Sequence, residues 1–119
     1  MTPEELRHRT KEFSLRVVRL AASLPDDRVG NVFARQLVRC GTSIAANYRS
    51  ACRARSHAEF VSKIGIVEEE ADETVFWIEM SADARLIKRK LIEKLLAEGK
   101  EILAIITSSR KTAKNKKYV

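Results

Sequence analysis

The sequence predicts an all-α protein that folds as an antiparallel up-down-up-down four-helix bundle. The first observation is composition, because only four glycines and two prolines occur in 119 residues, with 45% apolar and 33% charged residues. Such a composition favours long helices over turn-rich sheet. The second is that apolar residues recur at helical spacing in four successive segments. The third is that only a few residues separate these segments, and short connections join antiparallel neighbours in helical bundles.

The first helix is expected to begin at Thr2 and Pro3. Thr2 and Glu5 have the spacing of a capping box, and proline is favoured at the first helical position, where its missing N–H has no helical partner. Pro25 and the two acids after it should end the helix. Spacings of three and four predict a buried seam of Leu6, Thr10, Phe13, Val17, Leu20 and Leu24.

The second helix should run from about Val29 to Arg53, and Gly41 near its apolar sector would permit close helix contact. The third should follow Ser56, which makes a second capping-box pattern with Glu59. On a helical wheel, the apolar sector of the second helix holds Phe33, Leu37, Cys40, Ile44, Tyr48 and Ala51. The seam of the third is predicted to be Phe60, Ile64, Val67, Ala71, Thr74 and Ile78.

The fourth helix is expected from about Lys88 to Arg110, with Gly99 as a small residue or a weak point at its middle. Its apolar residues are Ile92, Leu95, Leu96, Ile102, Leu103 and Ile106. A chain of this length buries one core. We therefore expect a single bundle domain over residues 1–111 and a basic, flexible tail over residues 112–119.

Charge is unevenly distributed along the chain. The formal net charge is +7. Residues 28–55 hold six arginines and no acid, which gives +6, whereas residues 59–83 hold eight acids and one lysine, which gives −7. A basic balance of this kind implies attraction to phosphate or other polyanions.

The two cysteines and the hydropathy suggest a compartment. Cys40 and Cys52 fall in one predicted helix, about 18 Å apart, which is too far for a disulfide. No apolar run approaches the roughly 20 residues that cross a bilayer. We expect free thiols and a cytoplasmic protein without a membrane partner.

An arginine stripe is the most informative local feature. Arg28, Arg35, Arg39, Arg49 and Arg53 fall within about 80° on the outer side of the second helix. Arginine forms bidentate contacts with phosphate or carboxylate, so the stripe could follow a nucleic-acid backbone. Its alternatives are ion pairs with an acidic helix, a protein partner or a solvated face. Arg55 could extend the basic surface.

Acids on the third helix invite comparison with di-iron bundles, but the comparison fails. Those sites need Glu-x-x-His pairs, and no histidine lies on the predicted helix beyond its start. His8 and His57 have no partner at nucleophile or metal spacing, and no phosphate-binding glycine motif is present. We therefore expect no metal, no cofactor and no catalytic residues.

A second apolar stripe on the third helix lies outside its seam. Ile66, Trp77 and Met80 alternate with Glu70 and Glu73. Aromatic residues and methionine are enriched at interface cores, and these acids could receive arginines from a neighbouring subunit. We predict an oligomer interface here. The alternative is that Trp77 flanks the core of the monomer.

Several runs resemble a known family. These runs are RQLVRCGTSIAANYR at 35–49, RARS at 53–56 with Glu59-Phe60, EEEADET at 68–74 and WIE at 77–79. They resemble the bacterial four-helix-bundle family related to ribosomal RNA intervening-sequence proteins. Many members carry Glu-Gly where this chain has Arg49 and Ser50, so a role assigned to that pair does not carry over.

The resemblance implies an up-down bundle. Relatives include the accessory protein of diversity-generating retroelements, a pentameric barrel that binds reverse transcriptase and nucleic acid, so a pentamer and a reverse-transcriptase partner are implied. Our hypothesis is a non-catalytic homo-oligomeric adaptor that binds RNA, DNA or a polymerase–nucleic-acid complex through the arginines. The alternative is a structural protein-interaction module with no nucleic-acid role.

Overall fold

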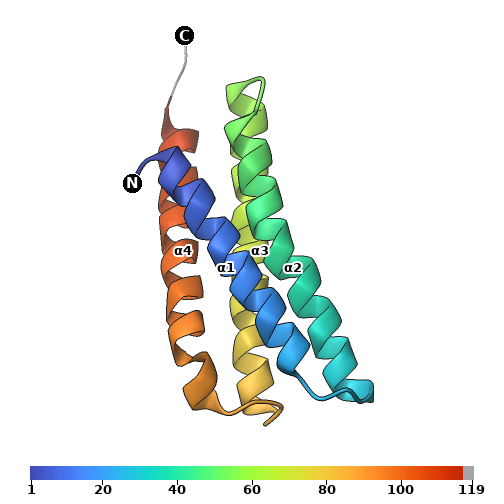
Figure 1. The fold of residues 1–119 in the computed structure, drawn as a ribbon. Helices are drawn as coiled ribbons and strands as arrows, with labels where there is room; N and C mark the ends of the chain where they lie inside the picture. Colours follow the sequence, from blue (N-terminus) through green and yellow to red (C-terminus); the bar gives the residue numbers. More distant parts are fainter. Residues whose placement is uncertain (117–119) are drawn as a thin grey trace.

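Four long helices run alternately down and up the molecule, as Figure 1 shows. The structure is a computed structural model that describes residues 1–116. The helices are α1 (Pro3–Ser23), α2 (Arg28–Cys52), α3 (His57–Asp83) and α4 (Arg89–Asn115). The four-helix up-down bundle predicted from the sequence is confirmed. None of the helices within residues 1–116 is both long and apolar enough to cross a membrane.

Polar caps set where the first three helices begin. The Thr2 hydroxyl accepts from the Glu5 N–H at 3.1 Å and the Glu5 carboxylate accepts from the Thr2 N–H at 3.4 Å, which completes the predicted capping box. Asp27 caps α2 by accepting from the Gly30 N–H at 2.8 Å. The sequence analysis had given this aspartate only the role of ending the first helix.

The second capping box differs from the prediction. The Ser56 hydroxyl accepts from the Glu59 N–H at 3.0 Å, as expected of an N-cap. The Glu59 carboxylate, however, accepts from the N–H of Arg55 at 3.2 Å and not from that of Ser56. This bond fixes the residue before the cap, so it shapes the connection between α2 and α3.

The core contains most of the predicted seam residues, and three others, Phe33, Phe60 and Leu103, are partly buried against it. Phe13, Val17, Leu37, Ile44 and Ile78 are buried almost completely. The α1 and α2 backbones approach closely at Gly41, whose carbonyl accepts from the Ser14 hydroxyl at 2.6 Å. Gly99 is buried in α4, and a Cβ there would lie 2.9 Å from Cζ of Phe13. Both glycines therefore serve as small residues where helices meet.

The α1–α4 side is held differently from the other three sides. The helices α1–α2, α2–α3 and α3–α4 pack along their lengths, whereas α1 and α4 touch in fewer places. The Arg9 guanidinium joins them, because it donates two hydrogen bonds of 2.7 Å to the Glu98 carboxylate and forms an ion pair with Glu101 at 2.9 Å. The hydrogen bond from Arg9 lowers the pKa of Glu98, and the two carboxylates raise the pKa of Arg9.

The fourth helix is longer than predicted. It was expected to end near Arg110, but it continues to Asn115 because Ala113 is buried at 7% exposure and extends the apolar side by another turn. Residues 112–115 of the expected tail are therefore helical. Lys116 is the C-cap of α4, and the last three residues of the expected tail, 117–119, lie outside the described residues.

Candidate nucleic-acid interface

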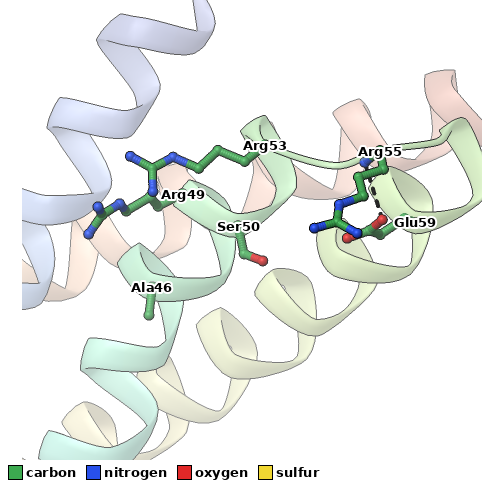
Figure 2. A pocket seen from close by; sticks show the side chains of 6 residues that line it. All are labelled: Ala46, Arg49, Ser50, Arg53, Arg55 and Glu59. Carbon is green, nitrogen blue, oxygen red and sulfur yellow. Dashed lines mark hydrogen bonds between the residues drawn. The ribbon is translucent and has the colours of Figure 1, made fainter.

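The turn between α2 and α3 brings three of the predicted arginines together. Arg49, Arg53 and Arg55 line a hollow of about 390 Å³. Its remaining lining residues are Ala46, Ser50 and Glu59. Figure 2 shows Arg49 and Arg53 extending to one side, with Arg55 and Glu59 on the other and Ser50 between them. We call this the arginine hollow.

Short-range hydrogen bonds position the arginine hollow. At the end of α2 the N–H of Arg53 bonds the carbonyl of Ser50 at 3.1 Å, and the N–H of Ala54 bonds that of Ala51 at 3.1 Å. The chain then enters α3 after only four residues, from 53 to 56. This tight connection returns Arg55 beside the last turn of α2, where Arg49 and Arg53 stand one turn apart on the same face.

The other predicted arginines lie toward the start of α2. Arg28 and Arg35 are exposed there, as are all six arginines of the predicted surface. The ion pairs that form among residues 1–116 leave out Arg28, Arg35, Arg49, Arg53 and Arg55. The three arginines and one glutamate of the arginine hollow thus give it a formal charge of +2, and its guanidinium donors can engage phosphate oxygens in bidentate contacts.

Arg39 behaves differently from the rest of the stripe. Its guanidinium pairs with Glu73 and lies 3.5 Å from Glu70, and it also donates to Gln36 at 3.0 Å. Glu70 and Glu73 reach Arg39 within one chain because α3 packs against α2, and Gln36 lies one turn before Arg39 on α2 itself. The stripe is therefore interrupted at its middle, and the sequence alone gave no register between the two helices that could have shown this.

The predicted oligomer-interface residues are partly used within the monomer. Trp77 packs edge-to-face on Phe33 of α2, with ring centroids 5.1 Å apart, and contacts the core. This is the alternative in which Trp77 flanks the monomer core. Glu70 and Glu73 pair with Arg39 as described, and Ile66 and Met80 are half-buried.

Phe76 was missed by the sequence analysis and is the exposed aromatic of this region. It is 52% exposed and packs edge-to-face against Trp77 with centroids 5.2 Å apart. The signal was present in the sequence, since a wheel places Phe76 opposite the α3 seam among acids.

Within residues 1–116, no group of three or more His, Cys, Asp or Glu side chains could hold a metal ion. Two acids of α3 pair with α4 instead: Glu68 with Arg110 at 3.1 Å and Glu79 with Lys100 at 3.7 Å. Cys40 is buried, and burial raises the pKa of its thiol.

Comparisons with known proteins agree with the resemblance drawn from the sequence. A family model described as 23S rRNA-intervening sequence protein matches residues 5–108. A crystal structure of a protein of unknown function from the S23 ribosomal protein family of Bacteroides thetaiotaomicron is 33% identical, with a TM-score of 0.85. The match covers 93% of this chain and 99% of that chain. No curated protein matches.

The match therefore spans most of the bundle and includes α2, α3 and the arginine hollow. The chain belongs to the 23S rRNA intervening sequence protein family.

Proposed function

We propose that the protein is a non-catalytic, homo-oligomeric cytoplasmic adaptor that binds the backbone of RNA or DNA, alone or within a reverse-transcriptase complex. The observation that carries the proposal is the arginine hollow. Arg49, Arg53 and Arg55 line one hollow at one end of the bundle without an ion-pair partner among residues 1–116. Exposed arginines at helical spacing favour backbone contacts, which do not read sequence.

Backbone binding has a characteristic dependence on salt. Each phosphate that an arginine neutralises releases condensed counterions, so the logarithm of the binding constant falls by about 0.9 per tenfold increase in salt. The arginine hollow is exposed, as is Arg28, which forms no ion pair within residues 1–116, so they can reach a duplex without rearrangement of the core. Arg39, which is engaged with Glu70 and Glu73, should contribute less than its neighbours.

The test is a salt titration of the double variant Arg49→Gln, Arg53→Gln with a short RNA duplex and a DNA duplex of the same sequence. Loss of two phosphate contacts should reduce the salt slope by about 1.8, which corresponds to about 30-fold weaker binding near 0.15 M salt. The matched control is Lys90→Gln, Lys94→Gln, which removes two exposed charges near the start of α4. Its affinity and slope should remain near those of the unaltered protein.

An equal loss of affinity and salt slope in both double variants would mean that net charge alone drives binding, and the arginine hollow would then have no special role. An unchanged slope in the arginine variant would refute the proposal directly. Measurement on several unrelated sequences adds a second criterion, because backbone contacts predict the same loss on each.

The second candidate function is a structural protein-interaction module, and exposed apolar residues favour it. Val38 is 40% exposed, Leu15 is 41% exposed and Phe76 is 52% exposed. In this alternative, arginines of α2 in one subunit pair with acids of α3 in a neighbouring subunit. Such a module predicts assembly that persists when the protein shows no affinity for either duplex.

A further inference from the structure

An apolar groove runs along the outside of the bundle between α1 and α2. Its volume is about 570 Å³, and it is lined almost entirely by carbon. The lining residues are Val18, Ala21, Ala22, Ala34, Arg35, Val38 and Arg39. Three alanines leave the space open, because their side chains are too short to fill the gap between two helices.

The apolar surface extends beyond the groove itself. Leu15, Val18 and Ala22 follow the spacing i, i+3 and i+7 on α1, so they share one side of the helix. Leu15 is 41% exposed, and Val38 on the facing helix is 40% exposed. The rim is basic, because Arg35 is exposed and takes part in none of the ion pairs among residues 1–116. An occupant must therefore combine apolar side chains with negative charge.

The outer side of α3 has the complementary character. Phe76 is 52% exposed, and its packing against Trp77 holds the ring in place. Met80 lies one turn further on the same side, and Asp72 lies one turn earlier. Asp72 is exposed and is absent from the ion pairs formed within residues 1–116. We call this side, with Phe76 at its centre, the acidic aromatic ridge.

We infer that the acidic aromatic ridge of one copy docks in the α1–α2 groove of a second copy. The two surfaces match in apolar character and are opposite in charge, at Asp72 and Arg35. They lie on different helices, with the groove on α1 and α2 and the ridge on α3. The contact is therefore head-to-tail: the copy that offers its groove keeps a free ridge, and the copy that offers its ridge keeps a free groove, so each can bind one further neighbour. This inference deepens the homo-oligomer of the proposed function and rests on it.

The experiment uses one variant for each surface, Phe76→Ser for the ridge and Val38→Glu for the groove. An aromatic hot spot at the centre of an interface is worth about 2 kcal/mol or more, so Phe76→Ser should weaken association about 30-fold or more. Val38→Glu places a carboxylate opposite the acids of the ridge. Both positions are at least 40% exposed, so the monomer should fold normally. Mass by light scattering should fall to that of one chain for each variant.

Mixing the two variants provides the decisive measurement. Phe76→Ser retains an intact groove and Val38→Glu retains an intact ridge, so an equal mixture should form a complex of two chains and no larger species. The control Leu91→Glu, at a position 70% exposed on α4, should keep the mass of the unaltered protein. A monomeric unaltered protein, an assembly that survives either variant, or a mixture that stays monomeric would overturn the inference.

The same variants separate this inference from the proposed function. The monomeric Val38→Glu protein retains the arginine hollow, so it should still bind an RNA duplex in a salt-dependent way. If assembly follows the expected pattern while no variant binds RNA, the docking inference stands and the nucleic-acid proposal fails. If RNA binding is present but the mixture does not assemble, the docking inference alone fails.

Discussion

Replacing Gly41 with alanine tests the close approach of α1 and α2. A Cβ at this position would lie 2.5 Å from Cγ1 and 3.0 Å from Cβ of Val17. Val17 is fully buried, and a β-branched side chain has few alternative rotamers in a helix. Relief therefore requires movement of the helices. Gly65→Ala is the matched control, because its nearest neighbour would be Nε of Arg110 at 3.4 Å.

The two substitutions should change stability in opposite directions. Alanine in place of glycine within a helix stabilises by about 1 kcal/mol, which both variants gain. Overpacking against a fixed core side chain costs about 2–3 kcal/mol, which only Gly41→Ala incurs. Gly65→Ala should therefore be about 1 kcal/mol more stable than the unaltered protein, and Gly41→Ala about 1–2 kcal/mol less stable. At roughly 4 °C per kcal/mol, the Tm values should differ by about 10 °C.

The assay is urea unfolding followed by far-ultraviolet circular dichroism, at one protein concentration because assembly would shift the apparent stability. A double-mutant cycle with Val17→Ala should return a favourable coupling energy of about 1 kcal/mol or more, since the smaller side chain removes the clash. If Gly41→Ala proves as stable as Gly65→Ala, the close approach is not a constraint and the reasoning is refuted.

Three further predictions concern charge, capping and backbone conformation. Glu98→Gln should cost about 1 kcal/mol at neutral pH, because the carboxylate accepts from Arg9 in a partly exposed setting. The folded pKa of Glu98 is lowered, so this stabilisation is fully present above the ordinary glutamate pKa of about 4.3 and should be lost as the pH falls through the lower folded pKa; a pH-independent difference would contradict it. Ser56→Ala should cost about 1 kcal/mol through the lost cap, and equal urea midpoints would count against that role. Arg85→Gly should stabilise by about 1 kcal/mol, since φ is +62° at Arg85, and a lower Tm would exclude relief of strain.

The sequence was most informative where a feature depends on neighbours along one helix. The capping box at Thr2 and Glu5 and the buried Thr10 both follow from spacing alone, and both are present. The end of α4 did not follow, because residues 111–116 are polar or basic and only Ala113 marks the continuing apolar side. One small residue is a weak signal against such a composition.

The candidate site was likewise predictable where it depends on one helix, and was not predictable where it depends on contacts between helices. The exposed arginines on α2 were found from their angular positions, but their grouping depends on contacts between helices. Arg55 joins Arg49 and Arg53 because the connection after α2 is short and Glu59 bonds the Arg55 N–H. Arg39 pairs with Glu73 because of the register between α2 and α3, and the spacing of residues along one helix carries no information about that register.

The sparse α1–α4 side has a consequence for the order of folding. The three well-packed sides join helices that are consecutive in the chain, so contact order is low and folding should take microseconds to milliseconds. The exceptions are the contacts between α1 and α4, such as the bond from Arg9 to Glu98, which lies 89 positions further along the chain and must close one of the longest loops in the bundle. Loop-closure entropy opposes that contact until the other helices have docked. We therefore expect it to form after the transition state, so that weakening it speeds unfolding while leaving the folding rate almost unchanged.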